Sequence, residues 1–281
     1  MVIHTQKKSL VQALSFANKI DKIGFVPTMG ALHAGHISLV KRALSENEIV
    51  VVSIFVNPTQ FNNSADLQKY PRTPDADISL LKDLNEEIIV FLPEVSDLYE
   101  DTVAAKKYHF GNIEKEMEGK HRKGHFDGVG TIVNKLFRIV KPDAAYFGEK
   151  DYQQLQIVKK LVALEKLHTK IIGCPILREE NGLAMSSRNK RLSTKQFEEA
   201  ATIYKTLNEV RDKFGSTSIT DLNHLVAERF LQNPDLKLEY FEIANEKTLK
   251  TAKRKNKATK YRAFIAAFAG EVRLIDNMPL N

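Results

Sequence analysis

The fold is decided by residues 23–36, IGFVPTMGALHAGH, in which a short apolar run leads into a glycine-containing turn and then into a helix. The run 23–27 predicts a buried strand, and residues 35–45 predict the helix. Gly30 and Gly35 allow the backbone to approach a ligand closely, and a helix N-terminus offers free N–H groups and a positive dipole end to a phosphate. The spacing matches neither G-x-x-x-x-G-K-S/T nor G-x-G-x-x-G, which argues against a P-loop kinase and a dehydrogenase.

Outward from this stretch, strand-length apolar runs alternate with helix-period segments up to about residue 175. The predicted strands are 23–27, 49–56, 88–92, 144–147 and 169–173. The predicted helices are 35–45, 75–87, 127–140 and 151–166. The strands are continuously apolar, which is typical of parallel strands buried on both faces. We therefore expect an α/β fold with a doubly wound parallel sheet over residues 1–175, and ligands at the carboxyl ends of its strands.

The pattern changes after residue 175. Helices are predicted at 194–214 and 220–231, and strands at 238–244, 263–269 and 272–276, the last two joined by a hairpin at 269–271. This predicts a smaller α+β domain over residues 176–281, entered through the crossing segment 174–188. The polar, proline-containing stretch 57–74 is predicted to be a long loop and a lid.

Composition narrows the class of protein. The chain has 281 residues, 43% of them hydrophobic and 27% charged, which is ordinary for a soluble globular protein. The single cysteine, Cys174, excludes an intramolecular disulfide framework and a thiolate zinc cage. No secretory h-region follows the first residues, and the longest apolar stretch, 49–56, is far short of the ~20 residues that span a bilayer. We expect a cytoplasmic protein without membrane contact.

The net charge of +7 is local. Residues 247–262 contain eight basic residues and no acid, so the rest of the chain sums to −1. This favours a solvated loop or hairpin over a nucleic-acid surface. The alternative is a basic RNA-binding protein.

Two histidines and two later segments bear on the chemistry. His33 and His36 lie three residues apart at a helix start and are therefore near neighbours, suited to donating hydrogen bonds to a nucleotide α-phosphate. The alternatives are two helix-capping histidines, or a metal pair completed by His121 and His125.

The segment 147–154, FGEKDYQQ, follows the fourth predicted strand, where Lys150 is a candidate phosphate contact and Glu149 and Asp151 are candidate helix caps. The tetrapeptide Met185-Ser186-Ser187-Arg188 adds hydroxyl donors and a cation suited to a leaving pyrophosphate.

Together these motifs resemble the nucleotidyltransferase superfamily related to class I aminoacyl-tRNA synthetases. More closely, the chain resembles the pantothenate synthetase (pantoate–β-alanine ligase) family along essentially its whole length. The blocks that carry the resemblance are PTMGALHAGH, SIFVNPTQF, YPRTPDAD, GHFDGVGTIVNKLF, FGEKDYQQL and GLAMSSRN. The resemblance implies a Rossmann-like domain that condenses pantoate with β-alanine at the cost of ATP, through pantoyl adenylate, with release of AMP and pyrophosphate.

The resemblance also implies the site residues. His36, His33 and Lys150 are implied as catalytic, with His36 stabilising charge at the α-phosphate. The implied ATP-binding residues are Met29, Gly30, Ala31, Leu32, His33, Ala34, Gly35, His36, Gly148, Glu149, Lys150, Asp151, Leu177, Met185, Ser186, Ser187 and Arg188. Leu177 stands where the family often has valine.

Gln60 and Gln154 match residues that hold pantoate, and Gln60 also borders the β-alanine site. Tyr70 and Arg122 match mobile segments of the site. Mg²⁺ is implied with the ATP phosphates, assisted by Asp77, although position 76 is alanine where some relatives are acidic. No organic prosthetic group and no nucleic-acid partner are expected, and a homodimer through the first domain is implied. The competing enzymatic interpretation is a nucleotidyltransferase that makes a dinucleotide at the same H-x-G-H site.

Overall fold

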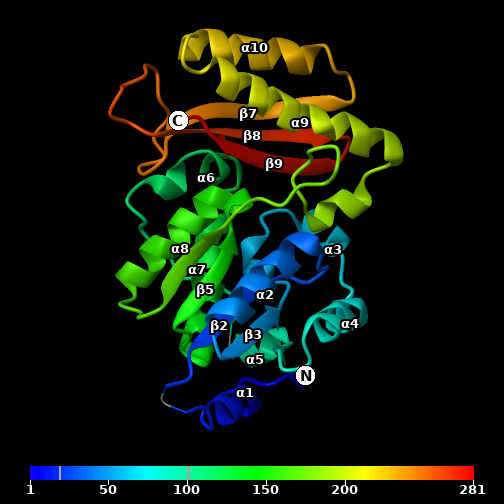
Figure 1. Ribbon diagram of the computed structural model, residues 1–281, viewed down its shortest axis with the longest axis vertical. Helices are drawn as coiled ribbons and strands as arrows, with labels where there is room; N and C mark the ends of the chain where they lie inside the picture. Colours follow the sequence, from blue (N-terminus) through cyan, green and yellow to red (C-terminus); the bar gives the residue numbers. More distant parts are fainter. Residues whose placement is uncertain (19, 100–101) are drawn as a thin grey trace.

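The computed structural model describes residues 1–18, 20–99 and 102–281. Within them lies a six-stranded, all-parallel sheet in the order β1-β4-β3-β2-β5-β6 (Figure 1). Its strands are β1 (Val2–His4), β2 (Ile23–Thr28), β3 (Ile49–Ile54), β4 (Ile89–Phe91), β5 (Ala144–Gly148) and β6 (Lys170–Cys174). From β2 the chain continues to β3 on one side of that strand, whereas β5 and β6 lie on its other side. The strand order therefore reverses between β2 and β5. The carboxyl ends of β2 and β5 therefore meet at the crevice where α/β sheets bind ligands.

Helices cover both faces of this sheet. On one face, α2 (Ala34–Glu46) and α4 (Pro74–Leu84) pack against Val26 and Tyr146. On the other, α1 (Lys7–Leu14), α7 (His125–Val140) and α8 (Tyr152–Leu164) pack against Phe25 and Phe147. Consecutive strand residues thus enter opposite cores, which explains the continuously apolar runs. The doubly wound parallel sheet is confirmed.

The C-terminal part contains a second sheet. Strands β7 (Leu236–Asn245), β8 (Tyr261–Ala269) and β9 (Val272–Pro279) are antiparallel, and α9 (Thr194–Lys213) and α10 (Ile219–Leu231) pack with them around a separate core. The predicted hairpin at 269–271 is present, with Gly270 at φ 59°. The predicted division of the chain at 175/176 falls just after β6, and it stays a prediction.

Three regions differ from the sequence-based expectations. Neither β1 nor α1 was expected. β1 is only three residues long and pairs with β4 at the edge of the sheet, so it shows no strand pattern in the sequence. The expected loop 57–74 holds η1 (Pro58–Gln60) and α3 (Ser64–Lys69). Helix α3 begins where the Asn63 side chain accepts hydrogen bonds from the N–H groups of Ala65 and Asp66. Short helices α5 (Val95–Leu98), η2 (Ile113–Lys115) and α6 (Glu118–His121) also lie in an unassigned region.

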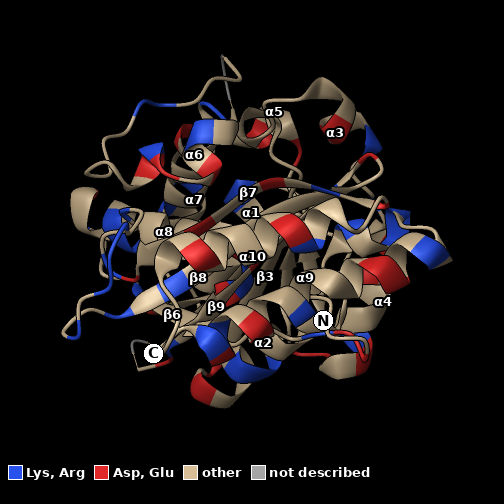
Figure 2. Cartoon of the chain, turned by 90° about the horizontal axis from the view of Figure 1, so that it is seen from above, with Lys and Arg blue, Asp and Glu red and all other residues tan. Residues whose placement is uncertain are grey.

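Most of the basic segment lies in the loop between β7 and β8, as expected, whereas Arg262 lies on β8 and is buried. Lys255 donates to the carbonyl oxygens of Phe214 and Thr217, and Arg262 pairs with Glu246 at 2.9 Å. Elsewhere, basic and acidic side chains are interspersed over the helices (Figure 2). Part of the basic segment therefore has an internal structural role. None of the helices in the described ranges is long and apolar enough to cross a bilayer.

The close approach of α7 to η1 generates a first prediction. A Cβ added to Gly128 would lie 2.2 Å from the carbonyl oxygen of Thr59 and 2.8 Å from the Cα of Gln60. We expect Gly128→Ala to destabilise the protein by about 1–3 kcal/mol, because overpacking against backbone cannot be relieved by a side-chain rotation. Gly215→Ala is the matched control, since a Cβ there meets no atom within 4 Å. Urea unfolding measures both variants, and a Gly128→Ala protein as stable as the control would contradict this packing.

Candidate active site

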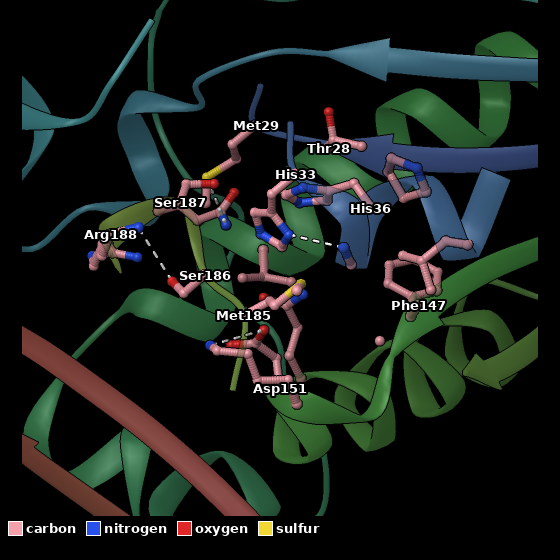
Figure 3. Close-up of a pocket in the computed structure, with 18 of the residues that line it drawn as sticks. Thr28, Met29, His33, His36, Phe147, Asp151, Met185, Ser186, Ser187 and Arg188 are labelled. Carbon is pink, nitrogen blue, oxygen red and sulfur yellow. Dashed lines mark hydrogen bonds and ion pairs between the residues drawn. The ribbon is translucent and has the colours of Figure 1, made fainter. Parts of the chain in front are cut away.

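One cleft opens at the carboxyl ends of β2 and β5, where residues from distant segments converge (Figure 3). Sixteen of the residues proposed from the sequence line it. They are Met29, His33, Gly35, His36, Gln60, Tyr70, Arg122, Gly148, Lys150, Asp151, Gln154, Leu177, Met185, Ser186, Ser187 and Arg188. The apolar wall of the cleft includes Val129, Val133 and Leu136, all from α7.

Six further predicted residues are not part of this lining. Ala31, Leu32 and Asp77 are buried. The others, Gly30, Ala34 and Glu149, stand in the chain beside cleft residues but do not line the cleft.

The turn between β2 and α2 is held by the Asp77 carboxylate. Its two oxygens accept hydrogen bonds from the N–H groups of Leu32 at 2.7 Å and Ala31 at 2.9 Å, and the hydroxyl of Thr73 donates at 3.1 Å. Gly30 and Ala31 have φ angles of 80° and 49°, a conformation that is strained for alanine. A buried carboxylate must be hydrogen-bonded. Asp77 therefore stabilises this unusual turn.

The two histidines at the start of α2 are neutral. The Nδ1 of His33 accepts from the N–H of Gly35, so its Nε2 carries the proton in the neutral ring. Burial, together with the charges of Lys150 and Lys190, lowers the pKa of His33 to about 4. Burial and the neighbouring His33 lower the pKa of His36 to about 3, and the ring centroids are 4.1 Å apart. The Nδ1 of His36 is buried without a hydrogen-bond partner in the described structure. Both rings can therefore donate only as neutral imidazoles near pH 7.

Hydrogen bonds from the C-terminal sheet fix the backbone of the segment that follows β5. The buried side-chain amide of Asn277, on β9, donates to the carbonyl oxygens of Glu149 at 2.9 Å and Lys150 at 2.8 Å. Arg262 in turn donates to the Asn277 side-chain oxygen at 2.6 Å. Sequence reasoning missed Asn277, because an isolated asparagine in a late strand gives no motif.

Gln60 is fixed by residues on two sides. The Nδ1 of His125 lies 2.8 Å from the Gln60 carbonyl oxygen, and its Nε2 lies 3.2 Å from Arg122. Burial and the charge of Arg122 lower the pKa of His125 to about 3, so the neutral ring donates to the carbonyl and accepts from the guanidinium. Asn57 donates to the Gln60 side-chain oxygen at 3.2 Å, which leaves the amide N–H₂ as the donor toward Met29 and the cleft. His125 and Asn57 were missed as supports of Gln60.

The segment 185–188 completes the cleft from the crossing region. Ser187 donates to the carbonyl oxygen of Ala31 at 3.0 Å and so joins the crossing segment to the β2–α2 turn. Ser186 accepts from the N–H of Arg188. The backbone of Leu177 accepts from Met185, and the Leu177 side chain lines the cleft.

A histidine metal site is not supported. His125 is committed to Gln60 and Arg122, and His121 stacks on Tyr240 with ring centroids 4.9 Å apart. Within the described ranges no group of three or more His, Cys, Asp or Glu could hold a metal ion. The two oxygens of Asp77 accept hydrogen bonds from the N–H groups of Leu32 and Ala31, and the implied contact of this carboxylate with Mg²⁺ stays a prediction.

Comparison with known proteins agrees with this architecture. A family model described as pantoate-beta-alanine ligase matches residues 2–279. A pantothenate synthetase of Flavobacterium psychrophilum is 58% identical over 258 residues, 92% of each chain, and one of Christiangramia forsetii is 50% identical over 282 residues, the whole of both chains.

Solved structures of this kind also match the fold over the whole chain. Pantothenate synthetase from Thermus thermophilus matches with a TM-score of 0.92 and 37% identity, over 100% of this chain and 99% of that one. The ligase from Francisella tularensis, complexed with beta-gamma ATP and β-alanine, matches with a TM-score of 0.84 and 41% identity, over 100% of this chain and 98% of that one.

The lowered histidine pKa values predict how stability depends on pH. Between the ordinary value of about 6.5 and the folded values of about 3–4, the unfolded chain binds protons that the folded chain does not. This contribution to the free energy of unfolding is present above pH 6.5 and is lost as pH falls. We expect His125→Gln to lessen the decline between pH 6.5 and 5, measured by urea unfolding. The exposed His224→Gln is the control, and an unchanged slope in His125→Gln would contradict the prediction.

Proposed function

The chain belongs to the pantoate–β-alanine ligase family, and we propose that its cleft carries out the ATP-dependent ligation in two steps through pantoyl adenylate. The ligation of pantoate and β-alanine with ATP is the activity of this enzyme. In the proposed first step, a pantoate carboxylate oxygen attacks the α-phosphorus and the bond to the bridging oxygen of pyrophosphate breaks. In the second, the β-alanine amine attacks the acyl carbon, AMP leaves, and the amine loses a proton. The family assignment decides against the dinucleotide-forming and RNA-binding alternatives.

The observation that supports the two-step route is that two neutral histidines and the 185–188 segment share one cleft (Figure 3). Lys150 lines the same cleft, and its charge acts on both histidines. We assign the ATP phosphates to the start of α2, where backbone N–H groups and the helix dipole favour anions. The neutral His33 and His36 then donate to the α-phosphate without requiring a proton to be transferred. The negative charge that develops on the departing pyrophosphate is stabilised by Lys150, Ser186 and Arg188.

Pantoate is assigned to the part of the cleft between Gln60 and Gln154. The Gln60 amide is oriented by Asn57, and the Gln154 amide has no protein partner in the described structure. Neutral amides orient a carboxylate without neutralising the charge that makes it a nucleophile. The apolar α7 wall suits the two methyl groups of pantoate, and Gln60 also borders the space assigned to β-alanine.

Three further assignments complete the proposal. Mg²⁺ would be held mainly by the ATP phosphate oxygens, where it would offset phosphate charge, because the Asp77 oxygens hold the backbone N–H groups of the β2–α2 turn. Tyr70 and Arg122 line the cleft beside η1 and α3, in keeping with a lid over 57–74. The homodimer through the first domain stays a prediction, supported by the exposed Val2 and Ile3 on edge strand β1. The cytoplasmic location is also a prediction.

Pyrophosphate exchange tests the proposed route. We expect labelled pyrophosphate to enter ATP when pantoate is present and β-alanine is absent, because the first step is complete without the amine. Formation of pantothenate should require β-alanine. Exchange that depends on β-alanine would contradict the adenylate route.

Lys150→Ala tests the assignment of the phosphate site. We expect single-turnover adenylate formation to slow by about 10²–10³-fold, the usual effect of removing one preorganised electrostatic contact. Lys159→Ala, an exposed lysine on α8, is the matched control. Near-normal adenylate formation by Lys150→Ala would remove this lysine from the catalytic residues.

A further inference from the structure

A carboxylate on the short helix α3 joins two arginines of the crossing segment. One oxygen of Asp66 lies 2.7 Å from an N–H₂ group of Arg188, and the other lies 3.2 Å from Arg191. All three side chains are largely buried, with 22%, 19% and 27% of the Arg188, Arg191 and Asp66 side chains exposed. Of these, only Arg188 was singled out by the sequence motifs.

The carboxylate approaches Arg188 from outside the active-site cleft. Arg188 lines both this cleft and a second cleft that adjoins it, whereas Asp66 and Arg191 line only the second. The guanidinium also lies over the ring of Tyr70, 5.4 Å from its centroid. Arg188 is thus held by a carboxylate and an aromatic ring while it borders the active-site cleft.

We propose that Asp66 is a positioning residue for the ligation: it fixes the Arg188 guanidinium toward the phosphate site and makes the docking of α3 part of pyrophosphate binding. This rests on the proposed role of Arg188 as a phosphate contact. The group that Asp66 prepares the site for is a diphosphate, either the β- and γ-phosphates of ATP or the pyrophosphate product.

A positioning residue is needed because it costs free energy to hold the like charges of Arg188 and Arg191 close together in fixed conformations. Arginine has a long, flexible side chain, and Arg188 and Arg191 would repel each other at this separation without a shared anion. The bridging carboxylate offsets the repulsion and removes the rotamer freedom before any ligand arrives, which is preorganisation. One negative charge against two positive charges leaves the pair with a net attraction for phosphate.

The position of Asp66 is itself fixed by α3. Its N–H donates to the Asn63 side chain that caps the helix, so the carboxylate is placed by the first turn. A second ion pair, Lys69 with Glu271 at 2.6 Å, also ties α3 to the C-terminal part. The Glu271 side chain is 80% exposed, so this second pair contributes little. Asp66 is therefore the ionic contact through which α3 can affect Arg188, beside the ring of Tyr70 at the end of the helix.

The test measures binding of pyrophosphate and, separately, of AMP by calorimetry. We expect Asp66→Asn to weaken pyrophosphate binding roughly tenfold and to leave AMP binding within about twofold, because AMP lacks the diphosphate. Removal of a negative charge would by itself strengthen binding of an anion, so the expected sign differs from a purely electrostatic effect. Unchanged AMP binding also shows that the variant is folded.

Two comparisons distinguish positioning from other roles. Lys69→Met removes the other ion pair of α3 and is expected to leave pyrophosphate binding unchanged. In an Arg188→Ala background, Asp66→Asn should add no further loss, because Asp66 acts through that arginine.

Pyrophosphate binding that is unchanged or tighter in Asp66→Asn would overturn the proposal, as would an equal loss in Lys69→Met or additive losses in the double variant. Arg188→Ala reports separately on the underlying assignment. If that variant binds pyrophosphate normally, the phosphate role of Arg188 is wrong. If Arg188→Ala weakens binding and Asp66→Asn does not, only the positioning role falls.

Discussion

The hydrogen bonds from two consecutive backbone N–H groups to the buried Asp77 carboxylate are the interaction on which the active site depends. They hold Gly30 and Ala31 at positive φ, and this turn sets where α2 begins. The position of α2 in turn places His33 and His36 at the edge of the cleft. The same turn receives the Ser187 hydroxyl at the carbonyl oxygen of Ala31, so the crossing segment is positioned against it. A single acid behind the cleft therefore organises two of its walls.

The C-terminal sheet is a structural part of the site. Asn277 holds the backbone at Glu149 and Lys150, and Arg273 makes two hydrogen bonds to Glu118 on α6 at 2.9 and 2.7 Å. Burial alone would raise the pKa of Glu118, but the hydrogen bonds and charge of Arg273, with the charge of Arg122, lower it to about 2. Glu118 is therefore ionised at neutral pH. Contacts from the C-terminal sheet thus hold the backbone at Lys150 and the Glu118 carboxylate that pairs with Arg122, and both of these cations line the cleft.

Much of this architecture could be predicted from the sequence. The continuously apolar strands identify a sheet buried on both faces, and turn residues mark the ends of β2 and β5, so the location of the cleft follows from topology. The motif blocks supply most of the lining residues. The edge strand β1 and the short helix α3 escaped prediction because each is too short to show a period, and their formation depends on pairing with β4 and on the Asn63 cap.

The supporting residues could not be found in the same way. His125 and Asn277 act through hydrogen bonds to backbone carbonyl groups distant in sequence, and Asn57 acts through a side-chain contact with nearby Gln60. A lone polar residue in an apolar segment does not show what it contacts. For Asp77 the sequence suggested a metal ligand, whereas its oxygens face backbone N–H groups.

The most direct test of the central claim is Asp77→Asn, because it keeps the size of the side chain and replaces one acceptor with a donor that opposes a backbone N–H. The account predicts a loss of about 1–3 kcal/mol in the free energy of unfolding, with weaker ATP binding measured in the absence of Mg²⁺. A variant with unchanged stability and unchanged metal-free ATP binding, but a higher Mg²⁺ requirement, would contradict it and make Asp77 a metal ligand.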